Sequence, residues 1–492
     1  MDHILAIDQG TTGSRAIVYD RRGREVACAY EEFPQYFPQP GWVEHDPEEI
    51  WRSVYRTIQK ALRSIPGSSI AAVGITNQRE TVFIWDRKTG KPVHNAIVWQ
   101  CRRTAERCRR LKAEKGMSGF IRKRTGLPVD SYFSATKVEW ILKHAASGRM
   151  AGGGGLCFGN ADAWILWKLT GGKSHATDPT NASRTMLFNI DTRRWDDDLL
   201  AMFGVPRDIL PRVLPSSGEF GRTAKIGRLP AGVPITGIAG DQQAALFGQA
   251  GFGPGSIKNT YGTGCFILLN TGRKRMASRH GLITTLACGP EGKAAYALEG
   301  SIFVAGAAVQ WLRDQLGLLK TSAESEAMAA SVEDNAGVYF VPAFVGLGAP
   351  YWDPGARGTI VGLTRGANKN HLVRAALEAM GYATRDVLEI MTKDSGLTFE
   401  ALRVDGGTAS NDFLCRFQAD ILGIPVIRPA SVETTALGAA YLAGLAAGIW
   451  KNTAEIKKLR EIDRIFPPAM KKSEADALYK GWLSAVRKSL SP

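Results

Sequence analysis

The feature that most constrains this chain is a pattern of strand, short Gly/Thr turn and strand, which occurs twice. Residues 4–20 read ILAIDQGTTGSRAIVYD, in which two apolar runs flank a polar turn. Residues 258–270 read KNTYGTGCFILLN and repeat this order around a second Gly/Thr turn. Apolar runs joined by a tight turn of this composition are typical of β-hairpins. We interpret the second segment as a degenerate internal repeat of the first, which predicts two related domains.

The first turn has the composition of an anion-binding loop. It combines closely spaced backbone N–H groups with hydroxyls and a cation, which suits a phosphate chain. These side chains belong to Thr11, Thr12, Ser14 and Arg15. Asp8, at the end of the first strand, is placed to hold Mg²⁺ through water. An ordinary polar hairpin accounts for so short a motif equally well. Residues elsewhere in the chain are therefore needed to distinguish a phosphate-binding loop from an ordinary turn.

The length and composition of the chain restrict its class. With 492 residues it exceeds what one hydrophobic core usually supports, so we expect two large domains with a cleft between them. Hydrophobic residues make up 44% and charged residues 22%, which excludes long disorder. The formal net charge is +15, yet there is no zinc-finger spacing, RNP-type motif or long Lys/Arg tract. Solvated helix faces and attraction of an anionic substrate explain this charge better than nucleic-acid binding does.

Cysteine usage and apolar patterns favour a soluble protein of a reducing compartment. The seven cysteines are scattered and without a CxxC pair, so neither a disulfide framework nor a zinc site is expected. The N-terminus lacks a signal-peptide pattern, and a long uncharged run, residues 434–450, is too short and too rich in Gly and Ala for a membrane span. We expect a buried helix there, a cytoplasmic location and no membrane insertion. A glycine run at 152–155 lacks the Lys-Ser/Thr of a phosphate loop and is interpreted as a surface loop.

A polar cluster follows one of the predicted strands in the first half of the chain. The strand at 70–76 runs into the sequence NQRE at 77–80, after which apolar residues resume. Arg79 beside Glu80 offers a donor fork and a carboxylate acceptor, which match adjacent hydroxyls of a polyol. Trp99 supplies an aromatic plane of the kind that packs on sugar carbons. Taken singly, each of these features is more often structural.

Two later strand ends carry residues suited to catalysis and nucleotide binding. Asp241 follows a glycine-containing strand predicted at 234–240 and precedes a helical run. A carboxylate there can accept the proton of a substrate hydroxyl, and it can equally cap the helix; the two roles are compatible. The predicted strand beginning at Leu402 ends in Gly406 and Gly407, and such glycines allow a backbone to approach a nucleotide closely.

Two Gly/Thr hairpin turns, a Gly-Asp junction between them and a late Asp-Gly-Gly resemble the superfamily of actin, hexokinase and the heat-shock ATPases. More narrowly, the chain resembles the FGGY family of carbohydrate kinases over nearly its whole length, and within it the branch whose acceptor is glycerol. The stretches that carry this resemblance are GWVEHDP (41–47), ITNQRET (75–81), NAIVWQCRRT (95–104), TNASRTMLFN (180–189), GIAGDQQAALFGQ (237–249), KNTYGTGCF (258–266), PAFVGLGAPYWDP (342–354) and VDGG (404–407).

The resemblance implies an α/β fold of two ribonuclease H-like (actin-like ATPase) domains. Each would be a mixed β-sheet with flanking helices, and the active site would lie in the cleft between them. Residues 1–249 would form the domain that binds the polyol and the phosphates, and residues 250–492 the domain that binds the nucleotide. A homodimer or homotetramer is expected.

Matched residue by residue, the resemblance also implies a site for ATP, Mg²⁺ and glycerol. The ATP phosphates would contact Thr11, Thr12, Ser14, Arg15 and Thr263, and the nucleoside would contact Gly306, Gln310, Gly407 and Asn411. Glycerol would contact Arg79, Glu80, Trp99, Tyr132, Asp241, Gln242 and Phe266. Asp241 would be the general base, and Asp8 with Asp241 would lie near Mg²⁺. The implied reaction converts ATP and glycerol to ADP and sn-glycerol 3-phosphate.

Two alternatives stay open from the sequence. One is a sister FGGY kinase for xylulose, gluconate or another polyol. The other, from a different class, is a non-kinase actin-like ATPase, which needs no polyol-binding residues and hydrolyses ATP without an acceptor. Regulation is also open, because motifs that bind a sugar bisphosphate, carry a phosphorylated His or dock a transport protein in relatives are not matched at 226–232, 216–221 and 467–479.

Overall fold

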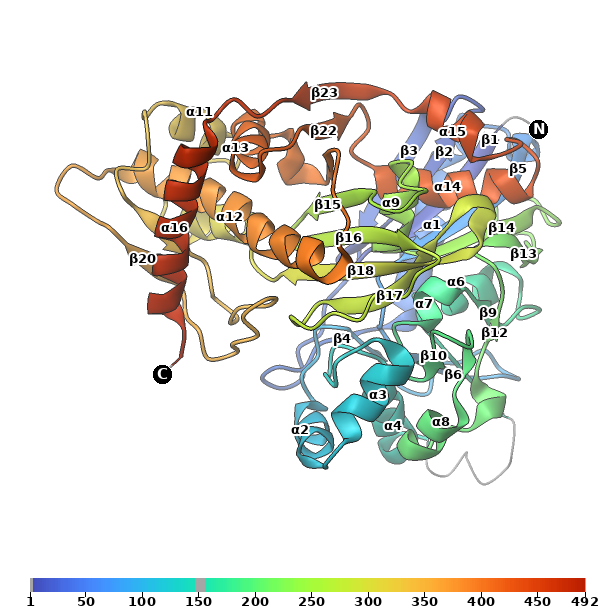
Figure 1. The fold of residues 1–492 in the computed structure, drawn as a ribbon. Coiled ribbons are helices and arrows are strands. Elements are labelled where there is room, and N and C mark those ends of the chain that lie inside the picture. Colours follow the sequence, from blue (N-terminus) through green and yellow to red (C-terminus); the bar gives the residue numbers. More distant parts are fainter. Residues whose placement is uncertain (1–2, 147–154, 492) are drawn as a thin grey trace. The chain divides into compact units, whose positions relative to one another are not determined.

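The structure, a computed structural model, describes residues 3–146 and 155–491. Most of the glycine run at 152–155, predicted to be a loop, lies outside these residues. The chain divides into two compact units (Figure 1): the first comprises Met1–Phe252, Thr284–Tyr296 and Thr435–Leu459, and the second comprises Gly253–Ile283, Ala297–Thr434 and Arg460–Pro492. The chain therefore returns twice to the first unit. The ligand assignment expected for residues 1–249 and 250–492 stays a prediction.

The first unit is built around a six-stranded sheet in the order β13-β14-β5-β1-β2-β3. Its strands are β1 (His3–Gln9), β2 (Gly13–Tyr19), β3 (Glu25–Glu32), β5 (Ile70–Asn77), β13 (Ser217–Arg222) and β14 (Pro234–Gly240). The first predicted hairpin is β1 with β2, whose antiparallel register pairs Gln9 with Ser14. Strands β1, β5 and β14 are mutually parallel. Their apolar residues are buried on both faces, as in parallel sheets covered on both sides.

The parallel strands of this sheet end at one edge, and the predicted polar residues collect there. Asp8 lies beside Thr76, and Thr76 lies beside Ala239. Because adjacent strands are about 4.8 Å apart, the backbones of these three positions lie within roughly 10 Å of one another. Asp8, the segment that follows Asn77 and the junction at Asp241 are thereby brought to the same edge of the sheet.

The second unit repeats this topology in a seven-stranded sheet ordered β17-β18-β16-β15-β21-β22-β23. The strands are β15 (Ile257–Tyr261), β16 (Cys265–Gly272), β17 (Ile283–Cys288, of which only Ile283 belongs to the second unit), β18 (Ala294–Ile302, whose first three residues belong to the first unit), β21 (Leu402–Asp405), β22 (Val426–Pro429) and β23 (Ile462–Phe466). In both sheets a hairpin is followed by two parallel strands and then by an antiparallel strand at the edge. The internal repeat predicted from the two Gly/Thr turns is confirmed at the level of topology.

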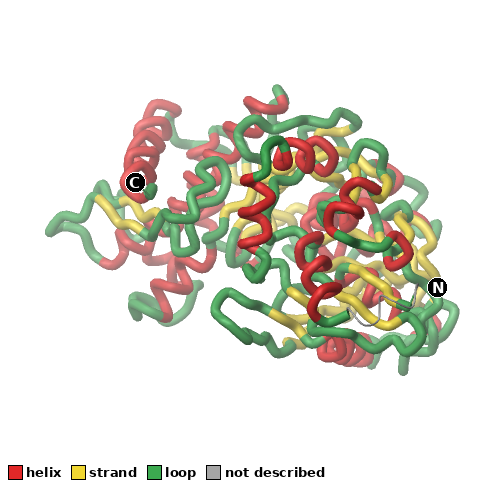
Figure 2. Tube along the Cα trace, turned by 90° about the horizontal axis from the view of Figure 1, so that it is seen from below, coloured by secondary structure: helices red, strands yellow, loops and turns green. Residues whose placement is uncertain are grey.

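Helices accompany both sheets (Figure 2). Those of the first unit are α1 (Pro47–Ala61), α2 (Ala105–Ala113), α3 (Met117–Thr125), α4 (Ala135–His144), α6 (Ala161–Leu169), α7 (Pro179–Ala182), α8 (Asp197–Phe203), α9 (Asp241–Gly248), α14 (Thr434–Ala446, whose first residue belongs to the second unit) and α15 (Thr453–Leu459). Those of the second unit are α10 (Gly306–Asp314), α11 (Glu324–Ala330), α12 (Lys369–Ser395), α13 (Asp412–Leu422) and α16 (Lys472–Ser489).

Short strands pair outside the two main sheets. They form the pairs β4 (Glu44–His45) with β7 (Ala96–Ile97), β6 (Phe83–Asp86) with β8 (Leu156–Gly159), β9 (Ala176–Thr177) with β12 (Arg212–Val213), β10 (Phe188–Asn189) with β11 (Arg194–Trp195), and β19 (Tyr339–Val341) with β20 (Thr359–Val361). The apolar residues after the NQRE cluster therefore leave the main sheet, which makes the cluster the point where the chain departs from the sheet edge.

Helix α14 is the buried helix predicted within residues 434–450. Gly438 explains its glycine content, because a Cβ there would lie 1.9 Å from the Ala244 carbonyl oxygen. The helix thus packs directly on the backbone of α9. Within residues 3–146 and 155–491, no helix is both long and apolar enough to span a membrane.

Candidate active site

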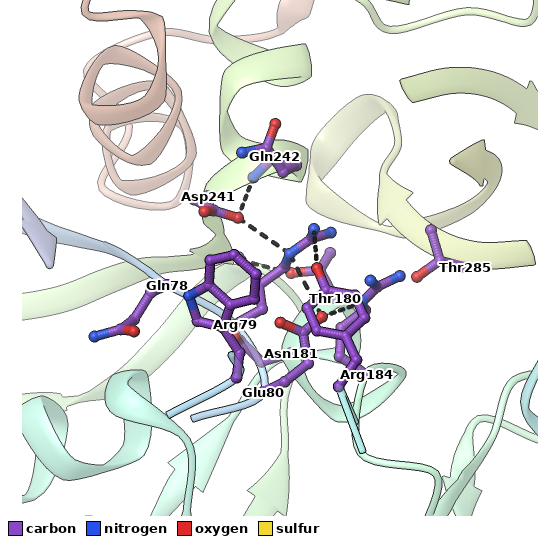
Figure 3. A network of polar contacts seen from close by, with 12 residues as sticks. Gln78, Arg79, Glu80, Thr180, Asn181, Arg184, Asp241, Gln242 and Thr285 are labelled. Carbon is purple, nitrogen blue, oxygen red and sulfur yellow. Dashed lines mark hydrogen bonds and ion pairs between the residues drawn. The ribbon is translucent and has the colours of Figure 1, made fainter. Parts of the chain in front are cut away.

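Four charged side chains, linked by ion pairs, lie where the parallel strands of the first sheet end (Figure 3). We call this set the charge chain; its members are Asp241, Arg79, Glu80 and Arg184. The Arg79 Nε lies 3.1 Å from an Asp241 carboxylate oxygen and 3.8 Å from a Glu80 carboxylate oxygen. The Arg184 Nε donates to the same Glu80 oxygen at 2.6 Å. Two arginines and two carboxylates therefore alternate, and each charge faces an opposite one. Such pairing is what makes the burial of ionic groups tolerable.

Burial differs sharply along this charge chain. The side chains of Arg79, Glu80 and Arg184 are 2%, 1% and 0% exposed, whereas that of Asp241 is 31% exposed. Asp241 begins α9, and its carboxylate accepts the Gln242 backbone N–H at 2.7 Å. The three buried side chains are thus fixed. Within the charge chain, Asp241 is the group that solvent or a substrate can reach.

Two aromatic rings border the charge chain. The rings of Trp99 and Tyr132 meet edge to face with centroids 5.5 Å apart. The Tyr132 hydroxyl accepts a hydrogen bond from Arg79 at 3.4 Å, and the Trp99 indole N–H donates to the Thr11 hydroxyl at 3.0 Å. Because an indole N–H can only donate, the Thr11 hydroxyl is the acceptor and directs its own hydrogen elsewhere. The aromatic residues therefore connect the charge chain to the first Gly/Thr turn.

The segment at the start of α7 holds this cluster in place, and it was missed as functional in the sequence. Asn181 exchanges side-chain hydrogen bonds with Asn77 at 3.0 and 3.1 Å, and the Thr180 hydroxyl accepts the Gly240 N–H at 2.8 Å. Arg184, three residues on, binds Glu80. In the sequence, the stretch TNASRT indicates only a family resemblance. Nothing local in it shows which distant residues it contacts.

Lys137 is a second residue that the sequence left without a role. It lies in α4, is fully buried, and its Nζ donates to the Ser131 and Tyr132 carbonyl oxygens at 3.0 and 2.6 Å. Burial lowers its pKa to about 8, and the nearby Glu80 carboxylate opposes that shift. The signal available in the sequence is a lysine close to the apolar residues Val138, Ile141 and Leu142. Lys137 fixes the loop that carries Tyr132.

The structure separates the residues predicted in the first turn by environment. Thr12 is exposed and Thr11 half-buried. The Arg15 guanidinium lies over the Tyr30 ring, 5.3 Å from its centroid. The Ser14 hydroxyl is buried and lies 2.7 Å from the Ser53 hydroxyl of α1, so this side chain contacts the helix. The role of these residues in phosphate binding stays a prediction.

In the second unit, the predicted nucleotide residues surround the second Gly/Thr turn. The Gly306 N–H, at the start of α10, donates to the Gly262 carbonyl at 3.1 Å, and a Cβ on Gly306 would lie 2.7 Å from that oxygen. Thr263, Gln310 and Gly407 are exposed, and Phe266 is half-buried. Asn411 is buried, with its side chain accepting the Leu414 N–H that caps α13 and donating to Ser325. A glycine at position 306 therefore permits the close approach of the start of α10 to the second turn. Contact of these residues with a nucleotide stays a prediction.

The donors present suit a nucleotide with Mg²⁺. Both turns combine threonine hydroxyls with glycines whose added Cβ would collide, Gly13 with the Tyr30 hydroxyl at 2.5 Å and Gly264 with the Ile302 carbonyl at 2.4 Å. The described residues hold no group of three or more His, Cys, Asp or Glu that could cage a metal ion. Mg²⁺ in phosphoryl transfer needs no such cage, since it is held by one or two carboxylates, water and phosphates. Asp8 and Asp241 meet that requirement.

Comparison with known proteins gives full-length matches. Residues 3–248 match the N-terminal domain of the FGGY family of carbohydrate kinases, and residues 257–447 match its C-terminal domain. A relative from Thermotoga maritima, named glycerol kinase 2, is 58% identical over all of this chain and 99% of its own length. A crystal structure of Plasmodium falciparum glycerol kinase with ADP superimposes with a TM-score of 0.93, at 37% identity over 100% of this chain and 99% of that one. Gluconate kinase from Lactobacillus acidophilus shares the fold, with a TM-score of 0.87 at 23% identity over 99% of this chain and 97% of its own.

Proposed function

The chain belongs to the FGGY family of carbohydrate kinases, and from that premise we propose that it transfers the γ-phosphate of ATP to a terminal hydroxyl of glycerol. The products would be sn-glycerol 3-phosphate and ADP. The name of the Thermotoga maritima relative supports glycerol as the acceptor, because that protein is 58% identical over the full length. The homodimer or homotetramer expected from the sequence stays a prediction.

The observation that carries this proposal is the charge chain of Glu80, Arg79 and Asp241. The buried Arg79 is held between two carboxylates, which leaves Asp241 as the partly exposed end. A guanidinium beside carboxylates offers donors and acceptors to adjacent hydroxyls of a small polyol. Trp99 and Tyr132 supply apolar surface for its carbon atoms. Gln242 and Phe266 remain proposed contacts on the same basis as in the sequence.

Asp241 is the proposed general base. Its carboxylate is anchored by Arg79 and by the Gln242 N–H, which fixes the orientation of the oxygens. Its other oxygen is then available to accept the proton of the attacking hydroxyl as the O–P bond forms. Positioning of this kind is the main contribution a protein makes to phosphoryl transfer, since little covalent chemistry is required of it.

ATP with Mg²⁺ would supply the phosphoryl group and neutralise the charge that develops during its transfer. The proposed phosphate contacts are Thr11, Thr12, Ser14 and Arg15 in the first unit and Thr263 in the second, with Asp8 and Asp241 near the metal ion. The proposed nucleoside contacts are Gly306, Gln310, Gly407 and Asn411. The collisions that a Cβ would cause at Gly13 and Gly306 support these assignments, because side chains there would obstruct both turns.

The acceptor is tested by the initial rate of ADP release from Mg-ATP. The rate is measured without an acceptor and then with glycerol, dihydroxyacetone, xylulose or gluconate. We expect glycerol to give the highest kcat/KM. A preference for xylulose or gluconate would identify a sister kinase of the family, and a rate that no acceptor raises would favour an actin-like ATPase.

A further inference from the structure

A buried network of amides and one imidazole lies behind the first Gly/Thr turn, and none of the roles assigned above uses it. His45, in β4, is 0% exposed, and its Nε2 lies 2.6 Å from the Gln35 side-chain oxygen. Its Nδ1 faces the Gln78 side-chain amide at 3.5 Å. Burial lowers the pKa of His45 to about 4, so the ring is neutral at physiological pH.

The hydrogen bonds of this network end on backbone carbonyls of the turn. The Gln35 amide donates to the Thr11 carbonyl at 3.0 Å, and the Gln78 amide donates to the Gly10 carbonyl at 3.2 Å. The Phe33 backbone N–H completes the set by donating to the Thr12 carbonyl at 3.2 Å. Three successive carbonyls of the turn, those of Gly10, Thr11 and Thr12, therefore accept hydrogen bonds from residues outside the turn.

The partners fix the tautomer of the imidazole. The Gln35 amide nitrogen is engaged with carbonyls, so its oxygen faces His45 and can only accept. The His45 Nε2 must therefore carry the hydrogen, which leaves Nδ1 as an acceptor toward the Gln78 amide. The ring donates to the Gln35 amide. It offers an acceptor to the Gln78 amide, which also donates to the Gln9 side-chain oxygen at 3.2 Å and accepts from the Thr81 hydroxyl at 2.9 Å.

The direction of the carbonyls determines the direction of the N–H groups. In a planar trans peptide, the C=O of one residue and the N–H of the next point in opposite directions. With the carbonyls of Gly10 and Thr11 held by the network, the N–H groups of Thr11 and Thr12 are turned away from it. Those two N–H groups therefore point to the opposite side of the turn from the network.

In the second unit, backbone N–H groups hold the corresponding carbonyls of the turn. There the carbonyls of Gly262 and Thr263 accept the N–H groups of Gly306 and Ala305, at 3.1 and 2.8 Å. In both Gly/Thr turns, the Gly and Thr carbonyls thus accept hydrogen bonds from residues outside the turn. Only the first turn does so through side chains that a neutral histidine contacts.

We propose that His45 is a positioning residue for nucleotide binding: through Gln35 and Gln78 it fixes the turn from Gly10 to Thr12 so that the Thr11 and Thr12 N–H groups meet phosphate oxygens. This inference rests on the proposed function, in which this turn contacts ATP. It assigns no catalytic role to His45, which lies behind the turn.

The test measures the affinity for Mg-ADP by calorimetry, together with the KM for ATP and for glycerol, in four variants. His45→Leu removes the ring contacts, and Gln35→Leu, at a half-buried loop position, removes only the bonds to Thr11, Phe33 and His45. His45→Gln keeps one donor and one acceptor. The matched control is His175→Leu, which removes another imidazole whose pKa burial lowers to about 4 and whose bond ends on the Phe158 carbonyl.

We expect His45→Leu and Gln35→Leu to bind Mg-ADP about tenfold more weakly, the loss expected for one or two hydrogen bonds, with a glycerol KM within about twofold of wild type. His45→Gln should recover most of this affinity. His175→Leu should lower the melting temperature without changing nucleotide affinity.

Unchanged Mg-ADP affinity in folded Gln35→Leu and His45→Leu would overturn the inference, as would an equal loss in His175→Leu. Failure of the proposed function gives a different result. In that case wild type itself would fail to bind Mg-ADP or to use glycerol.

Discussion

Asp241 stands out among the residues of the charge chain because its carboxylate is 31% exposed while its neighbours are almost completely buried. Arg79 and the Gln242 N–H hold it in one orientation. A fixed and accessible carboxylate at the end of a buried ion-pair chain is well suited to accept a proton from a bound hydroxyl.

The substitution Asp241→Asn should keep the shape of this site and remove the base. We expect kcat to fall about a thousandfold, within the range for loss of a positioned general base, while the affinity for Mg-ADP stays within about twofold. Steady-state kinetics with calorimetry would check both values. Turnover close to wild type would exclude Asp241 as the base.

Lys137 gives the stability of the fold a pH dependence whose sign follows from its burial. Burial lowers its pKa from 10.5 to about 8, so between these values the unfolded chain holds a proton that the folded chain has released. The contribution of Lys137 to stability therefore rises with pH across that window, by up to about 1.4 kcal/mol per pH unit. Below about pH 8 both states are protonated, and the cost of burying the charge is constant.

Urea unfolding at pH values just below and well above that window would test this dependence. Lys137→Met provides the comparison, because it cannot titrate and is close in length. We expect wild type to gain stability relative to Lys137→Met as the pH rises. A constant difference between the two proteins would show that Lys137 does not titrate in the folded state at those pH values.

At the scale of elements, short α7 positions the site more than its length suggests. Its Thr180 hydroxyl accepts the Gly240 N–H at the junction of β14 and α9, and donates to the buried Asp178. Asp241, the proposed base, follows directly after Gly240. Contacts of this kind place Asp241 relative to β5, the strand that Arg79 follows.

Replacing this hydroxyl by a methyl group in Thr180→Val keeps the volume and leaves a buried N–H without its acceptor. We expect a loss of about 1–3 kcal/mol in the free energy of unfolding, the cost of an unsatisfied buried donor. We also expect a lower kcat, because Asp241 is no longer held in register. Thr185→Val, five residues away, is the control, since its hydroxyl bonds only locally, to the Ala182 carbonyl and the Leu187 N–H. Equal kcat values for the two variants would contradict this role.

Local patterns predicted the elements whose signals are local. The hairpins around Gly10 and Gly262, the strand into Asn77 and the Asp241 junction were all predicted from runs of apolar residues and turn chemistry, and the structure confirms them. Helix α1 likewise begins at a local signal, because Asp46 precedes Pro47 and its side chain accepts the Glu48 N–H as the N-cap. These signals lie within a few residues of the structures they specify.

The supporting residues could not be predicted in the same way. Arg184 and Asn181 act through Glu80 and Asn77, each 104 residues away in the sequence, and nothing adjacent to them identifies these partners. Lys137 bonds to carbonyls only five and six residues before it, but its burial arises only in the folded chain. The network around His45 is hidden for the same reason. The burial that makes these polar residues informative exists only in the folded chain.

In the molecule as a whole, each unit contains one copy of the repeated hairpin. In both sheets the hairpin is followed by two parallel strands and an antiparallel outer strand. The proposed acceptor contacts Arg79, Glu80, Trp99, Tyr132, Asp241 and Gln242 lie in the first unit, and the proposed acceptor contact Phe266 lies in the second. The proposed nucleoside contacts Gly306, Gln310, Gly407 and Asn411 also lie in the second unit.

The most direct test of this account is phosphorus NMR of a reaction containing Mg-ATP and glycerol. The prediction is one phosphomonoester of glycerol, esterified at a terminal carbon, for each ADP formed, with no more inorganic phosphate than a sample without enzyme. Inorganic phosphate appearing in step with ADP, with no glycerol ester, would contradict it and identify the chain as an ATPase.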